Sequence, residues 1–292
     1  MTARTLELPA RALAVGRRFR RGDLMLYILL IPAAVATLMP IAYMLSQSLT
    51  PEADTLAWPI QWIPKNPTLN NFERLFNDPT LPVFRWLVNS VLVSLAVTAL
   101  VLLIDSLTAY AFARLRFPGR DFIFFVLLIS LMIPGHITLI PTFLLMRNLN
   151  FLDTYHALIW NHGAGVFGIF LLRQYFLSIP RELEEAAIVD GAGRLRLYWQ
   201  IAVPLVSSAL VALGIFTFLG SWNDLFWPLI VLSDRQQLTL PVGLAILGQG
   251  YYTQRSLTMA AAVVASFPVL LLYAVFQRRI IAGVSLTGLA GR

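Results

Sequence analysis

Six long stretches of this chain carry almost no charge, and they constrain its fold more than any other feature. A helix needs about 20 apolar residues to cross the hydrocarbon core of a bilayer. A membrane-spanning strand needs only about 9–11 residues, with alternating polarity. The stretches therefore predict an all-α integral membrane protein with six transmembrane helices. They are 24–49, 86–104, 122–146, 154–172, 197–223 and 256–277, and their only ionisable residues are His136, His156 and His162.

The composition supports a membrane environment for the whole chain. Hydrophobic residues make up 58% of the sequence and charged residues 13%, and the mean hydropathy is +0.72. A soluble domain is typically about 45–50% apolar and about 25% charged. The chain therefore has too little charge to cover a soluble surface. An ordinary soluble enzyme, a disordered protein and a coiled coil are excluded as descriptions of the whole chain, and the lipid bilayer is the expected partner of its apolar surface.

The first apolar stretch has two interpretations. Its flank is rich in arginine, and Ala34, Val35 and Ala36 form a small-x-small pattern, as in a cleaved signal peptide. However, the apolar stretch continues beyond this point to Leu49. This continuation favours an uncleaved first span.

Basic residues are distributed unequally between the two sets of connecting segments. With six spans, the segments 1–23, 110–121, 178–205 and 278–292 face one side and hold 15 basic residues, whereas the opposite segments hold six. Loops rich in Lys and Arg stay in the cytoplasm. The sequence thus predicts that both termini are cytoplasmic.

The same pattern predicts the domain boundaries. A cytoplasmic tail covers 1–23, a transmembrane domain covers 24–282, and a second cytoplasmic tail covers 283–292. Within the domain we expect spans at 24–46, 86–109, 122–146, 154–177, 205–232 and 256–277, with a cytoplasmic loop at 178–204.

Several kinds of site are excluded by the residues that the chain lacks. It has no Cys, and its three histidines lack the i, i+4 spacing of a zinc-binding helix, so we expect no metal site. The only lysine, Lys65, does not belong to a phosphate-binding P-loop, and no nucleophile motif is present. We therefore expect no catalytic residues. The net charge of +7 is spread between the apolar stretches, which argues against nucleic acid as a partner.

The predicted cytoplasmic loop contains a short helix with an unusual surface. Pro180 suits the first position of a helix, and acidic residues follow it near the positive end of the helix dipole. Ala186 and Ala187 give this helix a flat surface of small side chains, and Gly191 and Gly193 can end it by adopting positive φ. Two interpretations remain open on physical grounds: a helix that docks into a groove of another protein, and an amphipathic turn at the membrane interface.

A spacing pattern in this loop resembles a known family. Glu185-Ala186-Ala187, three further residues, Gly191, nine further residues and then Ile201-Ala202-Val203-Pro204 are similar to the EAA loop of ABC importer permeases, with Val203 where Leu is usual. The segments 109–119, 170–176, 221–224 and 239–244 are similar to the maltose-type permease subunit with six spans. The resemblance covers the chain from about residue 24 onward.

The resemblance implies a type I ABC importer permease fold and a multisubunit complex in a bacterial or archaeal cytoplasmic membrane. A second, homologous permease subunit would complete the pathway, two ATPase subunits would dock on the EAA loops, and an extracytoplasmic binding protein would deliver a sugar, such as a di- or oligosaccharide. ATP and Mg²⁺ would then bind the ATPase chains, with no cofactor on this chain. The resemblance implies that the ATPase-coupling residues are Glu184, Glu185, Ala186, Ala187, Asp190, Gly191 and Ala192.

Single residues of this loop keep simpler alternatives. Glu185 is either a partner of the helix dipole or a contact to the ATPase. Asp190 has the spacing to pair locally with Arg194.

A polar cluster interrupts the fifth apolar stretch. An aromatic ring beside amide and carboxylate groups is suited to sugar recognition, because the ring covers the apolar sugar face while the polar groups bind hydroxyls. Helix-breaking residues at membrane depth can also line a cavity, although simple kinks are an equal alternative. The candidate pathway residues are Trp222, Asn223 and Asp224, followed by Asn161, His162, Gly135 and His136.

Two further ionisable residues lie in or near the spans. Asp105 is expected to have a structural role near the cytoplasmic end of span two, where it would be partly hydrated, and Arg173 is expected to extend to the membrane surface. Proton-driven carriers usually contain relays of such groups. An ion-coupled secondary carrier is the alternative function. A relay of ionisable groups or an inverted repeat would favour it, and neither is evident in the sequence.

Overall fold

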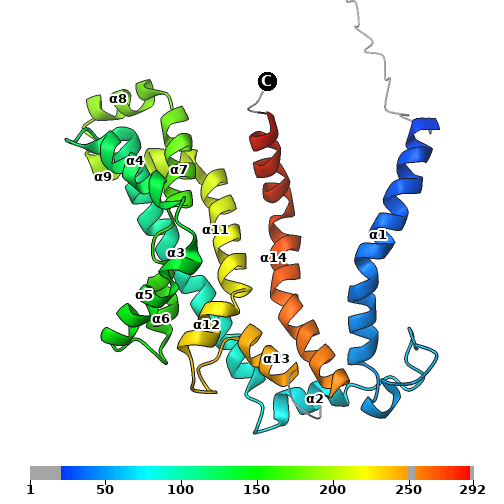
Figure 1. Cartoon of the computed structure of the whole chain (residues 1–292). Coiled ribbons are helices and arrows are strands. Elements are labelled where there is room, and N and C mark those ends of the chain that lie inside the picture. The colour runs from blue at the N-terminus through cyan, green and yellow to red at the C-terminus, as the bar shows by residue number, and fades with distance from the viewer. Residues whose placement is uncertain (1–20, 249–253, 290–292) are drawn as a thin grey trace, which may run out of the picture.

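The computed structural model describes residues 21–248 and 254–289, and these fold into helices joined by loops, with no strand in these ranges (Figure 1). The α-helices are α1 (Arg21–Ser48), α2 (Asn70–Asn77), α3 (Val83–Arg114), α4 (Arg120–Ser130), α5 (Gly135–Asn148), α6 (Tyr155–Ile159), α7 (Val166–Ser178), α8 (Arg181–Val189), α9 (Arg194–Arg196), α10 (Val203–Leu205), α11 (Ser207–Trp222), α12 (Phe226–Val231), α13 (Leu240–Gly248) and α14 (Arg255–Leu289). The short 3₁₀ helices η1 (Glu52–Asp54) and η2 (Trp160–His162) and the π-helix η3 (Leu197–Ala202) complete the set.

Three helices of the described ranges are long and apolar enough to cross a membrane, namely those at 25–48, 83–114 and 255–277. The stretch 122–146 was expected to form one helix. It is instead divided into α4 and α5, which meet at an angle of 100°. Pro134 explains the break, since a proline disfavours helical backbone in the residue before it and lacks an N–H group. Counting each bent pair as one span gives up to five candidate spans.

The fourth and fifth expected spans are also interrupted. The fourth consists of α6, η2 and α7, with residues 163–165 between the last two. The helical segment 194–205 meets α11 at 78°, and α11 ends at Trp222 before α12 begins. Each of these interruptions leaves backbone groups that no helix satisfies.

Side chains of α3 bind the backbone at one of these interruptions and in two loops between helices. This helix packs against both α7 and α11. Near its start, Trp86, Asn89 and Ser90 hydrogen-bond backbone atoms of the segment 235–240 at distances of 2.7–2.9 Å. This segment precedes and begins α13, so these bonds attach a non-helical connection to the centre of the bundle.

Asp105, in the second half of α3, caps another helix. Its Oδ1 atom accepts a hydrogen bond of 2.9 Å from the Gly165 N–H, directly before α7 begins. At this position the positive end of the helix dipole stabilises a negative charge. Its other oxygen, Oδ2, has no hydrogen-bond partner in the described structure. The expectation that Asp105 is partly hydrated is wrong, because its exposed fraction is 0%. The carboxylate approaches α7 closely because Gly168 has no side chain: a Cβ atom there would lie 2.1 Å from Oδ2.

Arg173 on α7 also differs from its expected placement. Its guanidinium carbon lies 4.2 Å from the centre of the Phe124 ring, and its Nε atom donates to the Phe112 carbonyl at 3.4 Å. Arg173 therefore joins α7 to α4 by a cation–π contact and to α3 by a hydrogen bond.

The buried apolar residues form two clusters at opposite ends of the bundle. One surrounds Trp86, Trp222 and Trp227, near α6, α12 and α13. The other surrounds Tyr110, Phe176 and the segment 197–213, near α8 and α9. Figure 1 shows these two ends at the bottom and the top of the view.

Helix α1 stands apart from the bundle in Figure 1 and contacts α14. Every side chain from residue 25 to residue 42 is exposed. Such a continuous apolar surface is suited to lipid or to another membrane subunit.

The loop after α1 is tied back to the start of α14. Glu52 accepts hydrogen bonds from the backbone N–H groups of Arg255 and Ser256, both at 2.9 Å, and from the Ser256 hydroxyl at 2.6 Å. Partial burial by itself would raise the pKa of Glu52, but these hydrogen bonds outweigh it and lower the pKa below its usual value. The charged form of Glu52 therefore caps α14.

The contact between Gly243 and Trp86 gives a stability prediction. A Cβ atom on Gly243 would lie 2.1 Å from the Trp86 ring, whose side chain is fully buried and hydrogen-bonded. We expect Gly243→Ala to lower the free energy of unfolding by about 1–3 kcal/mol, the usual range for overpacking. Thermal unfolding of the detergent-solubilised chain measures this change. Gly220→Ala is the control, because nothing lies within 4 Å of its Cβ position; equal losses in the two variants would contradict the packing argument.

Candidate functional site

The loop between α7 and α11 begins with α8, which ends at a glycine in the left-handed conformation. The Asp190 N–H donates to the Ala186 carbonyl at 3.1 Å, and the Ala192 N–H donates to the Ala187 carbonyl at 2.9 Å. Gly191 between them has φ +82°. A residue with a Cβ atom disfavours this conformation, so the turn depends on Gly191. The same expectation for Gly193 is wrong, because its φ is −75° and the chain is already extended there.

An ion pair attaches α8 to the end of α3. Arg114 Nε and Glu184 Oε1 lie 3.2 Å apart, and only 6% and 14% of the two side chains are exposed. The Nε and Oε1 atoms do not form an aligned hydrogen bond, so charge attraction holds this contact. Arg114 also donates from Nη2 to the Ile179 carbonyl, which joins it to the residues before α8. Glu184 therefore faces the bundle rather than the outer side of the loop.

The other predicted coupling residues lie on or beside the outer face of α8. Glu185, Ala186, Asp190 and Gly191 are exposed, and Ala187 and Ala192 are half-buried. The possible Asp190–Arg194 ion pair is absent from the contacts of the described residues. The exposed acidic groups of this set are thus Glu185, beside two small alanine side chains, and Asp190 at the end of the helix.

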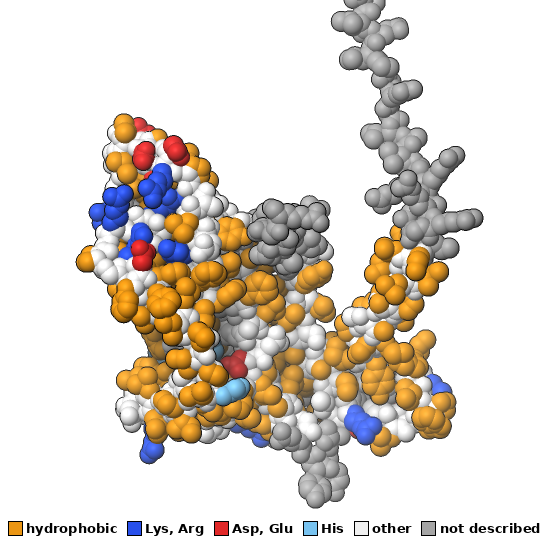
Figure 2. All heavy atoms as spheres, turned by 45° about the horizontal axis from the view of Figure 1, so that its top comes forward, with side chains coloured by type: hydrophobic (Ala, Val, Ile, Leu, Met, Phe, Trp, Pro, Cys, Tyr) orange, Lys and Arg blue, Asp and Glu red, His pale blue; other side chains and the backbone are white. Residues whose placement is uncertain are grey.

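The structure adds apolar residues to this face that the sequence pattern did not identify. Ile188 is 56% exposed, Val189 is 87% exposed and Leu195 is 73% exposed. They lie at the end of the molecule where acidic and basic side chains also gather in Figure 2. An exposed apolar patch rimmed by charges is typical of a docking surface. The sequence signal was the apolar pair Ile188-Val189 at the end of the helix, directly before Asp190 and Gly191. No other helix buries these two side chains in the described structure.

Two tyrosines connect the loop to the centre of the bundle. The Tyr198 hydroxyl, on η3, lies 2.6 Å from the Ser106 hydroxyl on α3. The Tyr198 ring lies 5.3 Å from the Tyr110 ring, which also meets Phe176 of α7. A displacement of the loop would therefore be transmitted to α3 and α7 through packed rings and one hydrogen bond.

A second group of polar residues lies at the break between α11 and α12. His162 Nε2 and Asp224 Oδ2 are 4.0 Å apart, which is too long for a hydrogen bond. The other ring nitrogen of His162, Nδ1, lies 3.0 Å from the Leu158 carbonyl. If Nδ1 donates to this carbonyl, Nε2 is an acceptor near the Asp224 carboxylate, and two donors, such as two neighbouring hydroxyl groups or the two hydrogens of one water molecule, can bind this pair.

Other predicted residues gather near this pair. The rings of His136 and Phe226 meet edge to face at 6.0 Å, which brings the start of α5 to α12. Gly135 begins α5 beside His136, and Asn161 is half-buried next to His162. In Figure 2, acidic and histidine side chains lie side by side at a hollow of the surface. The structure thus brings three sequence segments together around Asp224.

Trp222 and Asn223 face a different space from Asp224. They line a cavity of about 450 Å³ between α1, α11, α13 and α14, together with residues such as Met44, Leu244 and Ser266. Trp222 is only 3% exposed and stacks on Phe218 at 5.9 Å. The Asn223 amide nitrogen donates to the Leu219 carbonyl at 2.9 Å, and its oxygen accepts no hydrogen bond in the described structure. The sequence predicted residues 222–224 as one cluster. In the structure, Trp222 and Asn223 line the cavity beside α1, whereas Asp224 lies near His162.

A helical bundle with interrupted spans, an exposed loop helix and polar groups at the interruptions is the architecture of a membrane permease. Residues 106–286 match the family of binding-protein-dependent transport system inner membrane components. The chain belongs to this family. It is a multi-pass permease subunit of an ABC transporter rather than an enzyme. This family membership excludes the alternative function, an ion-coupled secondary carrier.

Relatives and a solved structure extend this match over most of the chain. The arabinooligosaccharides transport system permease protein AraQ of Halalkalibacterium halodurans is 36% identical over 260 residues, which cover 88% of this chain and 93% of the relative. The sn-glycerol-3-phosphate transport system permease protein UgpE of Yersinia pestis is 31% identical over 271 residues, covering 90% and 96%. A chain in the crystal structure of a bacterial ABC transporter involved in the import of the acidic polysaccharide alginate matches with a TM-score of 0.79 at 26% identity, covering 89% of this chain and 98% of that chain.

The buried ion pair at the loop gives a test with a matched control. Glu184→Gln leaves the charge of Arg114 buried without a counter-charge, and such a loss typically costs about 3–5 kcal/mol. We expect a lower midpoint of thermal unfolding and faster proteolysis within residues 178–193. The neighbouring exposed residue supplies the control, Glu185→Gln, which should unfold like the wild type. The structural role of Glu184 is refuted if the two variants behave alike.

Proposed function

We propose that this chain is the permease subunit of an ATP-driven importer for an oligosaccharide. The observation that carries the proposal is the family match over residues 106–286, combined with an apolar cavity and hydroxyl-binding groups at the helix interruptions. The names of the relatives support the substrate class, since AraQ is named for arabinooligosaccharides and the solved transporter for alginate. A glycerophosphate-type substrate remains a second candidate because of the similarity to UgpE.

The proposed complex contains this chain, a second homologous permease, two ATPase subunits and an extracytoplasmic binding protein. The name of the family supports the binding protein. The absence of a P-loop from the sequence supports a separate chain for ATP and Mg²⁺. The complex would lie in a bacterial or archaeal cytoplasmic membrane.

We further propose six crossings with both termini in the cytoplasm and the spans and tails bounded as the sequence predicts. The crossings would be formed by α1, by α3, by α4 with α5, by α6 with α7, by α11 with α12, and by α14. The unequal distribution of arginine supports the orientation, because it assigns the loop helix α8 to the cytoplasmic side. Two of the crossings would contain a short helix, α6 in one and α12 in the other, and polar side chains lie at the ends of these short helices.

In this proposal the outer face of α8 is the docking site of one ATPase subunit. Its exposed small and apolar residues, Ala186, Ile188 and Val189, would enter a groove, while Glu185 would contact the rim. The half-buried Ala187 and Ala192, with Asp190, would form the end of this surface. The Tyr198 contact with Ser106 supports a route from the loop to α3.

The substrate would pass the two neighbouring spaces around residues 222–224. Asp224 and His162 would each accept a hydrogen bond from a sugar hydroxyl, and the free oxygen of Asn223 would accept another. The fully packed Trp222 would form part of the cavity wall. His136, Gly135 and Asn161 would line the approach to this pair.

The first test of this proposal changes the hydroxyl-binding groups. In the complex reconstituted with its binding protein, Asp224→Asn should lower sugar uptake about ten-fold or more, since a hydrogen bond to a charged group is worth about 1.5–3 kcal/mol. Asn223→Ala should lower it several-fold, since a hydrogen bond between neutral groups is worth about 0.5–1.5 kcal/mol. Basal ATPase activity and membrane insertion should be unchanged. Asp78→Asn is the control, because Asp78 lies in the loop before α3 and bonds only to Thr80. Normal uptake and unchanged sugar preference in both site variants would exclude the assignment of these residues.

The second test addresses docking at α8. Gly191→Val forces a β-branched residue into a left-handed conformation, at a cost of about 1–2 kcal/mol, and adds bulk to the proposed contact. The ATPase activity stimulated by the loaded binding protein should collapse, while the chain still inserts. Gly193→Val is the matched control, because its φ is negative and nothing lies within 4 Å of its Cβ position. Full stimulation of the Gly191→Val complex would show that this turn is not the docking element.

A further inference from the structure

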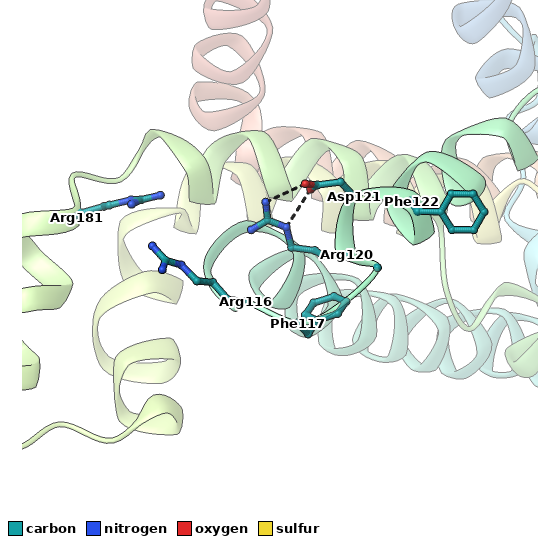
Figure 3. A pocket seen from close by; sticks show the side chains of 7 residues that line it. Arg116, Phe117, Arg120, Asp121, Phe122 and Arg181 are labelled. Atoms are coloured by element: carbon teal, nitrogen blue, oxygen red, sulfur yellow. Dashed lines mark hydrogen bonds and ion pairs between the residues drawn. The ribbon is translucent and has the colours of Figure 1, made fainter.

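A cavity of about 570 Å³ lies beside α8 at the charged end of the bundle, away from both spaces described for the substrate. Three arginines line it: Arg116 from the connection between α3 and α4, Arg120 from the start of α4, and Arg181 from the start of α8. Figure 3 shows the side chains of Arg116 and Arg181 reaching into the same space from opposite sides. The cavity therefore brings together positive charges from two parts of the sequence that are more than 60 residues apart.

Only one of these three charges is neutralised within the cavity. Arg120 forms an ion pair with Asp121, with Nε to Oδ1 at 3.0 Å and a second hydrogen bond from Nη2 at 3.4 Å. Arg116 and Arg181 have no ion-pair partner among the described residues, and both are exposed. With Asp121 as the only acidic lining residue, the cavity carries a net charge of +2. Guanidinium groups in such an arrangement bind phosphate groups well, because each presents several N–H donors.

The cavity continues into an apolar surface. Phe117 and Phe122 line it, and Phe122 is 72% exposed. Beyond Phe122, the exposed side of α4 carries Ile123, Phe125 and Val126, which are 45%, 60% and 48% exposed. A ligand held here by the arginines would have its remaining part against this apolar helix face.

We propose that this cavity binds the phosphate headgroup of an anionic phospholipid, whose acyl chains lie along the exposed face of α4. Arg116 and Arg181 bind the phosphate, and Phe117 and Phe122 contact the region between the headgroup and the chains. Basic pockets at the ends of transmembrane helices are suited to anionic headgroups for this reason. The proposal requires only that this end of the bundle lies at a membrane surface, so it is independent of the sugar that the transporter carries.

An acidic side chain of an ATPase subunit is the main competing occupant. The arrangement favours lipid, because the cavity borders the apolar face of α4 rather than the exposed residues of the docking surface on α8. Arg181 is the first residue of α8 and Val189 the last. At about 1.5 Å per residue, these two positions are roughly 12 Å apart along the helix. A bound lipid would therefore contact the start of α8 while leaving its outer face free.

Photolabelling of the complete reconstituted transporter tests the proposal. The membranes consist of phosphatidylcholine with a trace of phosphatidylglycerol that carries a photoreactive group at the start of one acyl chain, or of phosphatidylcholine with the same group. Peptide mapping should show stronger labelling of residues 117–126 by phosphatidylglycerol. Arg116→Gln with Arg181→Gln should lower this labelling by about an order of magnitude, since each basic residue near an anionic surface contributes roughly a five-fold preference.

Two paired variants separate charge from fold. Arg116→Lys with Arg181→Lys keeps both charges and should retain most of the labelling. Arg194→Gln with Arg196→Gln removes two exposed arginines from the same loop but outside the cavity, and should leave labelling unchanged. Loss of labelling in all three double variants would mean that the fold rather than the cavity charge had been disturbed, and would overturn the proposal.

Three further outcomes would also overturn it. The first is equal labelling of the wild type by phosphatidylglycerol and phosphatidylcholine. The second is displacement of the lipid by excess inorganic phosphate, which would make the cavity a site for a soluble anion. The third is unchanged labelling of the glutamine variant together with loss of ATPase subunits on purification, which would assign the cavity to an acidic side chain of the ATPase.

Discussion

Hydrogen bonds from polar side chains of the long helix α3 hold several non-helical segments of the chain, and this matters because a buried backbone group without a partner is costly. Near one end, Trp86, Asn89 and Ser90 bind the segment before α13. In the second half of the helix, Asp105 binds the amide that begins α7. At the other end, Arg114 binds the carbonyl before α8. One long, continuous helix therefore holds the break before α7 and two of the loops between helices.

This arrangement connects the two ends of the molecule through a single element. Arg114 and Ser106 attach the loop that carries α8 to the last turns of α3, through Glu184 and Tyr198. Asp105 lies only one residue from Ser106 and holds the start of α7, directly after the segment that contains His162. Movement of α8 would therefore act on the residues that face Asp224 without requiring a change within α3. The ion pair and the two rings are stiff contacts, so they suit the transmission of a small displacement.

Much of this fold follows from sequence patterns, and the exceptions have clear causes. The apolar stretches predicted the helices, and the E-A-A spacing predicted a short helix ending at Gly191, which the structure has with φ +82°. The breaks at Pro134 and at residues 163–165 were not placed, because proline and glycine permit both a kink and a full interruption. The choice between them depends on whether a neighbouring side chain, such as Asp105, can satisfy the released amide. Likewise, the pattern grouped Glu184 with Glu185, but adjacent positions on a helix face different directions, and only the position of Arg114 shows which one is buried.

The sequence by itself determined the membrane environment, the helical class, the family and the location of the loop helix, because these depend on composition and on residue spacing along the chain. The tertiary structure alone decided which polar residues meet. It brought His162 to Asp224 and His136 to Phe226, turned Trp222 away into a second cavity, and assembled Arg116, Arg120 and Arg181 around a common space. These groupings join segments that are far apart in the chain. They depend on the angles at the helix breaks: a residue such as Pro134 interrupts the helix locally, but the packing of the helices against one another brings the separated segments together.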